Sequence, residues 1–261
     1  MKPITELPFS NDFLTSKEHF WNCKTAKELE LCHKAGCGDK DHDVLLSIAQ
    51  NNKKLFRLIA TFVPTVDGWS STEKACVLAA MTLAMKPALI TEVGVYSGRS
   101  LIPMALAIQE NGSGRVVGID PYSAEASTEG ESGENATWWN NQQMHDTIME
   151  KFLSYVKSFR LDSVVSLIRK KSNEVDAPSG IGILSLDGNH TEQAVLDAEK
   201  FGQKVILGGI AVLDDLHWQA GGVLRAVDVL EEMGFKECYR KCGPSGNNES
   251  NDWNLMQRTK I

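Results

Sequence analysis

The sequence lacks any long apolar run. None of its segments approaches the ~20 consecutive apolar residues that a helix needs to cross a bilayer. The first residues, Met-Lys-Pro-Ile-Thr-Glu-Leu, also lack the apolar core of a signal peptide. These absences predict a cytoplasmic protein with no membrane partner.

Basic residues are also in short supply. The chain of 261 residues has 27 Lys and Arg against 34 Asp and Glu, which gives a net charge of −7 at pH 7. Because nucleic-acid binding depends on a basic surface that neutralises phosphates, this balance excludes nucleic acid as the main partner. With 42% hydrophobic and 23% charged residues, the chain can bury a sizeable globular core. We therefore expect a small molecule as the partner.

The six cysteines follow no disulfide pattern. Their scattered positions predict thiols in a reducing compartment. Cys23, Cys32 and Cys37 could be combined with His42 or His33 into a zinc site. Their spacing fits no common zinc finger, so we do not predict zinc.

What the sequence does contain is a strand, turn and helix pattern over residues 87–100. A mostly apolar run at 88–93 is followed by Gly94 and Gly98, and Ser100 opens an apolar segment with helical spacing. Glycines in such a turn let the backbone approach a ligand, and the free N–H groups at the helix start attract a carboxylate or a phosphate. Glu92 at the strand end would repel a pyrophosphate, but it suits a ligand that offers an ammonium group or ribose hydroxyls.

A second buried strand ends in Asp120, whose carboxylate can accept hydrogen bonds from both ribose hydroxyls. The apolar patterns predict an α/β fold with a doubly wound, mostly parallel sheet. Its seven strands are predicted at 88–93, 115–119, 163–168, 181–186, 210–213, 235–241 and 253–258, with helices at 71–86, 136–159, 191–201 and 222–233.

Residues 1–69 precede this unit and are predicted to form a helical cap, with helices over 15–32 and 42–62. Such a cap covers the substrate side or forms a dimer contact, and the sequence leaves both roles and a homo-oligomer open. Residues 121–135 are small, polar and acidic, which predicts a mobile loop at the ligand-bearing edge of the sheet. Trp138 and Trp139 follow it, and one of them could form an aromatic wall for a substrate, although core packing also explains such residues.

Three carboxylates follow two buried strands. Asp187 comes directly after strand 181–186, and Asp214 and Asp215 come directly after strand 210–213. If these strands are neighbours, their carboxyl ends bring the three carboxylates together, and such a cluster needs a cation or protons. Oxygen ligands suit Mg²⁺ or Mn²⁺, so the sequence predicts a divalent metal at this point. The alternative is that Asp187 caps a turn and the other two form a solvated pair.

Two histidines flank these carboxylates. His190 lies three residues after Asp187, and His217 lies two residues after Asp215. Since histidine titrates in the range that a general base needs, we predict His190 as the base and His217 as its competitor. A purely structural role is the alternative for each.

Several of these motifs together resemble a known family. Glu-Val-Gly-Val-Tyr-Ser-Gly-Arg-Ser at 92–100, followed by Val-Val-Gly-Ile-Asp-Pro at 116–121, resembles the first two motifs of class I S-adenosylmethionine-dependent methyltransferases. Asp-Gly-x-His from 187 and Gly-Gly-x-x-x-x-Asp-Asp from 208 are similar to motifs of the metal-dependent O-methyltransferases, namely the macrolide sugar enzymes and catechol O-methyltransferase. The resemblance spans roughly residues 70–261.

The resemblance implies a Rossmann-like methyltransferase domain over 70–261, which transfers a methyl group from S-adenosylmethionine to a hydroxyl of a small molecule with Mg²⁺ or a similar cation. A sugar of a natural product or a vicinal diol is the implied acceptor, and the absence of a lysine next to Asp187 in the sequence favours the sugar. The expected cofactor-binding residues are Glu92, Gly94, Tyr96, Ser97, Gly98, Ser100, Asp120, Pro121, Ser172 or Asn173 at the adenine edge, and Asp187.

Two other functions are compatible with these motifs. The first is a metal-independent N- or O-methyltransferase whose carboxylates only hold the substrate, and the second is a non-catalytic protein that binds the cofactor. A dehydrogenase is disfavoured because the turn lacks the Gly-x-Gly-x-x-Gly pattern.

Overall fold

The computed structural model describes residues 48, 51–218, 221–241 and 252–260. Seven strands in this part form one sheet in the order β3-β2-β1-β4-β5-β7-β6. The first five strands in that order run parallel, and β7 pairs antiparallel with both β5 and β6. The predicted doubly wound, mostly parallel sheet of seven strands is therefore confirmed. The strands are β1 Leu89–Val93, β2 Arg115–Ile119, β3 Val165–Ile168, β4 Ile181–Leu186, β5 Val205–Asp214, β6 Phe235–Lys241 and β7 Trp253–Arg258.

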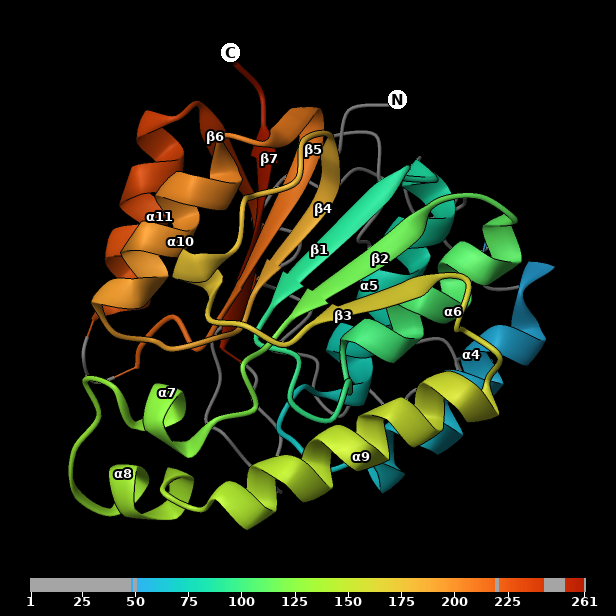
Figure 1. Cartoon of the computed structure of the whole chain (residues 1–261). Helices are drawn as coiled ribbons and strands as arrows, with labels where there is room; N and C mark the ends of the chain where they lie inside the picture. The colour runs from blue at the N-terminus through green and yellow to red at the C-terminus, as the bar shows by residue number, and fades with distance from the viewer. Residues whose placement is uncertain (1–47, 49–50, 219–220, 242–251, 261) are drawn as a thin grey trace.

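Helices cover both faces of the sheet (Figure 1). One face packs against α4 Lys53–Phe62, α5 Thr72–Met85, α6 Leu101–Asn111 and α9 Gln142–Ser158, and the other against α10 Glu192–Gly202 and α11 Gly222–Glu232. Each face has its own hydrophobic core, so β1 and β4 are buried along their whole length. Burial on both faces explains why these strands are nearly continuous apolar runs in the sequence.

The helix before β1 begins at Thr72, one residue later than predicted. Ser71 is the N-cap, and its hydroxyl accepts a hydrogen bond from the backbone N–H of Lys74 at 3.1 Å. Glu73 in the first turn forms an ion pair with Lys241. Lys86 closes the helix in a left-handed conformation directly before Pro87.

Residues 121–141 differ most from the prediction. The predicted loop contains α7 Ala124–Thr128, and the predicted helix at 136–159 is divided into α8 Gly133–Trp139 and α9. Local caps cause this division, because the side chains of Ser123 and Asn141 accept backbone N–H bonds at the starts of α7 and α9. Two short 3₁₀ helices, Val63–Thr65 and Ser172–Glu174, complete the described elements.

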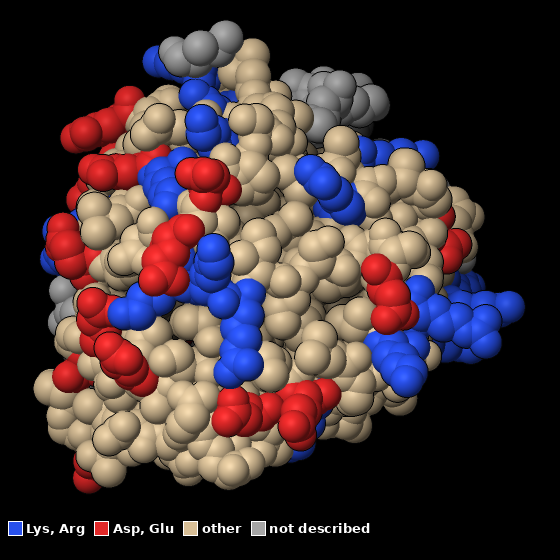
Figure 2. Space-filling view, viewed as in Figure 1, with Lys and Arg blue, Asp and Glu red and all other residues tan. Residues whose placement is uncertain are grey.

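The later part of the predicted helix over 42–62 is confirmed as α4, whose Phe56 and Ile59 are fully buried in the same core as α5 and α6. The predicted helix over 15–32 and the cysteines Cys23, Cys32 and Cys37 lie outside the described residues. None of the described helices is long and apolar enough to cross a membrane. On the face shown in Figure 2, acidic and basic side chains are interspersed.

A substitution at Gly94, directly after β1, tests whether the turn requires a glycine there. Its φ is +83°, and a Cβ atom there would overlap the backbone carbonyl of Asp187. We expect Gly94→Ala to lower the free energy of unfolding by at least about 3 kcal/mol, measured by urea denaturation. Gly112→Ala is the matched control, since Gly112 has a φ of +68° and open space around it. It should cost about 1 kcal/mol, and equal losses in the two variants would contradict the proposed crowding.

Candidate functional site

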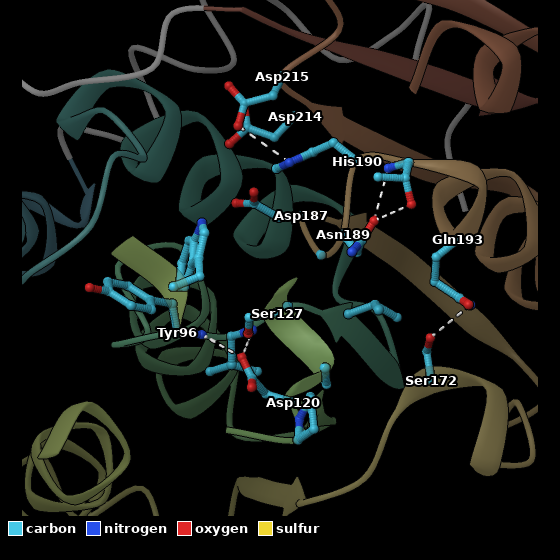
Figure 3. A pocket seen from close by; sticks show the side chains of 18 of the residues that line it. Tyr96, Asp120, Ser127, Ser172, Asp187, Asn189, His190, Gln193, Asp214 and Asp215 are labelled. Carbon is cyan, nitrogen blue, oxygen red and sulfur yellow. Dashed lines mark hydrogen bonds and ion pairs between the residues drawn. The ribbon is translucent and has the colours of Figure 1, made fainter. Parts of the chain in front are cut away.

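A large cavity lies at the carboxyl ends of the five parallel strands. Its volume is about 980 Å³, and the segments that follow β1, β2, β3, β4 and β5 all contribute to its wall. Ligand pockets usually measure roughly 300–1,000 Å³, so the cavity has room for a cofactor together with a second small molecule. Figure 3 shows Asp187, His190, Asp214 and Asp215 grouped in one part of it and Asp120 in another.

The turn after β1 is organised by Asp120 at the end of β2. One carboxylate oxygen of Asp120 accepts hydrogen bonds from the backbone N–H groups of Val95 and Tyr96, both at 2.9 Å. The other oxygen accepts one from the N–H of Tyr122 at 2.8 Å. Burial raises the pKa of Asp120, and these three hydrogen bonds lower it. Because a carboxylate has about four acceptor positions, Asp120 retains capacity for one ligand hydroxyl.

Lys74 from α5 lies between two of the predicted carboxylates. Its Nζ is 2.6 Å from Oδ2 of Asp214 and 3.5 Å from Oδ2 of Asp187, and its side chain is fully buried. Burial alone would lower the pKa of Lys74, but the charges of Asp214 and Asp187 outweigh it and raise the pKa above its ordinary value. Burial also raises the pKa of Asp187 well above its ordinary value, the charge of Asp214 raises it further, and Lys74 lowers it.

Asp187, His190 and Asp215 form a group that could hold a metal ion. One ligand atom from each lies within 4.8 Å of the others, and His190 Nε2 is 3.4 Å from Oδ2 of Asp215. Nε2 of His190 and Oδ1 of Asp214 are buried atoms that make no hydrogen bond. Asp215 also has a left-handed backbone with a φ of 54°, a strained conformation typical of functional sites. The group and the adjacent Asp214 therefore offer ligand atoms, some of them without a hydrogen bond, to a cation or a polar ligand.

Aromatic side chains form another part of the cavity wall. Trp69 stacks on Tyr96 at 5.4 Å between ring centroids, and Trp138 and Trp139 pack edge-on to each other at 4.6 Å. Trp69 contacts both of the latter rings, and Trp218 lies 5.4 Å from the ring of His190. The predicted aromatic wall is thus built by both Trp138 and Trp139 together with Trp69 and Tyr96, which come from other segments.

The segment between α7 and α8 reaches the loops after β3 and β4. The side-chain amide of Asn189 donates to the backbone oxygen of Glu129 at 2.7 Å, and Lys171 forms an ion pair with the Glu129 carboxylate at 2.8 Å. All three residues line the cavity, so this segment forms one of its borders.

Comparison with known proteins agrees with this geometry. Residues 91–216 match a family model described as a methyltransferase domain. This part of the chain is therefore a methyltransferase domain. The comparison with curated protein sequences found no match.

Solved structures share the fold of this methyltransferase. The O-methyltransferase TomG from Streptomyces achromogenes, involved in tomaymycin synthesis and solved with SAM, has a TM-score of 0.53 at 14% identity, over 84% of this chain and 90% of its own. Cofactor-bound Rv0187 from MTB has a TM-score of 0.54 at 13% identity, over 85% of this chain and 97% of its own. A SAM-dependent O-methyltransferase from Thermotoga maritima has a TM-score of 0.51 at 14% identity, over 79% of this chain and 72% of its own.

Most of the predicted site residues of the methyltransferase do line the cavity. They are Gly94, Tyr96, Ser100, Asp120, Pro121, Ser172, Asp187, His190, Asp214 and Asp215.

Five predicted residues lie elsewhere. The carboxyl of Glu92 is buried beneath the turn and accepts hydrogen bonds from the hydroxyls of Ser100 and Ser185. The Ser97 hydroxyl donates to the backbone oxygen of Asp67, and Gly98 packs against the ring of Phe152. Of the two predicted adenine contacts, Ser172 lines the cavity and Asn173 does not, and the backbone oxygen of Asn173 accepts a hydrogen bond from Lys200. His217 is 56% exposed and pairs with Asp252 outside the cavity wall, so its geometry does not support the role of a base.

The sequence-based prediction missed two residues of the cavity region, Lys74 and Trp69. Lys74 was absent from the predicted site although the sequence carries a signal, since a lysine in the first turn of an apolar helix opposes the helix dipole. Trp69 lies in the connection before α5, where no local pattern indicates a cavity wall. The sequence around Asp187 has no lysine, as noted above, and the lysine that does reach Asp187 is Lys74 from a distant segment.

Burial raises the pKa of Glu92 from 4.5 to about 7, although the hydrogen bond from Ser100 lowers it. Between these two values the folded protein keeps a proton that the unfolded chain has released, so the free energy of unfolding falls as pH rises. The loss amounts to about 3 kcal/mol by pH 8. We expect Glu92→Gln to flatten this fall when urea denaturation is repeated from pH 4.5 to 8. Parallel profiles for the variant and the wild type would contradict the raised pKa.

Proposed function

We propose that this methyltransferase transfers the methyl group of S-adenosylmethionine to a hydroxyl oxygen of a small molecule. The observation that carries the proposal is that one cavity holds both the turn after β1 and the group of Asp187, His190 and Asp215. A cofactor on the turn would thereby share the cavity with an acceptor that is bound at groups able to take up its proton.

Several cavity groups fit S-adenosylmethionine. Asp120 has acceptor capacity left for a ribose hydroxyl, and Gln193, hydrogen-bonded to Ser172 at 3.2 Å, lines the adjoining wall. The hydroxyl of Ser70 is buried in the wall and makes no hydrogen bond, so it is open to the amino acid part of the cofactor. The cofactor would supply a methyl group on a sulfonium: the acceptor oxygen forms a bond to the methyl carbon while the carbon–sulfur bond breaks and the neutral thioether leaves.

The proposed base that removes the acceptor's proton is His190. Its Nε2 lies in the cavity wall without a hydrogen bond, and the nearby Asp215 carboxylate stabilises the charged imidazolium that forms. Lys74 does not compete for this role, because the raised pKa keeps it protonated. The aromatic wall limits the access of water to the same space.

A divalent cation is the finer part of the proposal. Asp187 and Asp215 offer carboxylate oxygens, which suit Mg²⁺ or Mn²⁺, and His190 offers a ring nitrogen, which suits a transition-metal ion such as Mn²⁺ better than it suits Mg²⁺. A cation there would supply positive charge that lowers the pKa of an acceptor hydroxyl. If His190 is a ligand, it is not the base, so the two roles are alternatives. Asp214, predicted as a ligand, is bound to Lys74 through Oδ2 and has only Oδ1 open.

The proposed acceptor is a sugar hydroxyl or a vicinal diol. The sugar is favoured because the sequence has no lysine next to Asp187 that could act as the base, and Lys74, which reaches Asp187 from α5, stays protonated. A cytoplasmic location is also part of the proposal. We propose no membrane or nucleic-acid partner, and a homo-oligomer remains open.

The two histidines give a matched test of the base. His190→Ala should lower kcat by about 10²–10⁴-fold, because the acceptor's proton loses its nearest base or the cation loses a ligand. His217→Ala should leave kcat within about twofold, since that ring lies outside the cavity wall. Methyl transfer to a panel of hydroxylated acceptors, followed with labelled cofactor, measures both. Equal losses in the two variants would contradict this assignment.

The cation is tested by removing it. We expect S-adenosylmethionine to bind with similar affinity in Mg²⁺ and in excess chelator by calorimetry, whereas turnover should be lost in chelator and restored by Mg²⁺. Full turnover in chelator would favour the metal-free reaction with His190 as the base. Tight cofactor binding without methyl transfer to any acceptor would favour the non-catalytic alternative, and absence of cofactor binding would overturn the proposed function.

A further inference from the structure

Lys74 is the one buried cation next to the carboxylates of the site, among the described residues. It projects from the first turn of α5, where its N–H is held by the Ser71 cap, and its Nζ contacts Asp214 and Asp187. Burial of an ammonium group is costly unless carboxylates surround it. The first turn of a helix also disfavours positive charge. Its position is therefore determined by the carboxylates rather than by the helix.

The charges of the cluster can be counted. When all three carboxylates are ionised, as around a bound cation, Asp187, Asp214 and Asp215 carry three negative charges and Lys74 one positive charge, which leaves a formal charge of −3 + 1 = −2. A divalent cation balances this charge. Without Lys74 the same carboxylates would have a charge of −3 and would attract a cation more strongly.

Asp214 provides an independent sign that the cluster faces a ligand. Its side chain is 2% exposed and lines the cavity, and Oδ2 is bound to Lys74 while Oδ1 makes no hydrogen bond. A buried carboxylate oxygen without a donor is costly, so it indicates a partner that occupies the cavity. Lys74 holds this carboxylate in place and occupies its Oδ2, so that only Oδ1 is available to such a partner.

We propose that Lys74 is an internal counterion that weakens the affinity of this carboxylate cluster for divalent cations. The ammonium acts through Asp214 and Asp187 as a positioning residue: it orients both carboxylates and offsets one negative charge. A cation held by Asp187, His190 and Asp215 is then bound weakly enough to exchange. The inference rests on the proposed cation site, but it concerns the affinity of the cluster rather than turnover.

The test is the binding of Mn²⁺ to the purified full chain by calorimetry, without cofactor or acceptor. Lys74→Gln removes the charge and keeps an amide that can donate to Asp214, and Lys74→Met removes both. We expect Mn²⁺ to bind to each variant about tenfold or more tightly than to the wild type. Lys74→Arg keeps the charge and should stay close to the wild type.

A double variant separates charge from structure. Lys74→Met combined with Asp214→Asn restores the formal charge of −2, so its Mn²⁺ affinity should return to within about threefold of the wild type. A merely structural lysine would instead leave the affinity of the single variants unchanged or weaker, and either result would overturn the proposal. If neither the wild type nor the single variants bind Mn²⁺, the proposal is likewise overturned.

Folding is checked by thermal melting with and without Mn²⁺. If both single variants are unfolded without metal, Mn²⁺ should restore their melting transition at concentrations that leave the wild-type Tm unchanged, and failure to do so would overturn the inference. Cofactor binding and methyl transfer by the wild type, measured separately, show whether the proposed function holds. Failure of the counterion role and failure of the function therefore give different results.

Discussion

The close approach of Gly94 to the backbone of Asp187 is the constraint on which the site depends. The N–H of Asp187 donates to the backbone oxygen of Val93 at 2.9 Å, and the N–H of Gly94 donates to that of Ile119 at 2.9 Å. These bonds tie the ends of β1, β2 and β4 together at one edge of the sheet. The glycine turn and the carboxylates therefore line one cavity instead of two.

Electrostatics at this edge opposes stability. Three carboxylates, the buried Glu92 and the buried Lys74 lie near one another in a region of low polarity, and such clusters contribute little to stability even when they are paired. Glu92 keeps a proton to a pH of about 7 because burial raises its pKa. Tyr96, three residues after β1, and Asp215, directly after β5, add left-handed backbone, and both line the cavity. The two hydrophobic cores offset this strain.

The sequence predicted the central sheet well because the strands are buried on both faces. The strands at 115–119, 181–186, 235–241 and 253–258 have the predicted bounds, and 181–186 is a buried run with solvent-accessible residues on both sides. β5 starts at Val205 rather than at 210, because Gly208 and Gly209 read as a loop and instead lie within a strand whose pairing is irregular. The caps of α7 and α9 were missed because Ser and Asn are equally common in loops.

The sequence by itself determined the sheet edge at which Asp120, Asp187 and Asp215 meet, because strand-end residues of a parallel sheet share one edge. It also placed His190 there, three residues after Asp187. Only the tertiary structure decided which cation faces the carboxylates, since Lys74 and Asp214 are separated by 140 positions in the chain. It likewise placed His217 outside the cavity wall and brought Trp69 to the aromatic wall. These outcomes depend on contacts between distant segments, and no local spacing in the sequence encodes them.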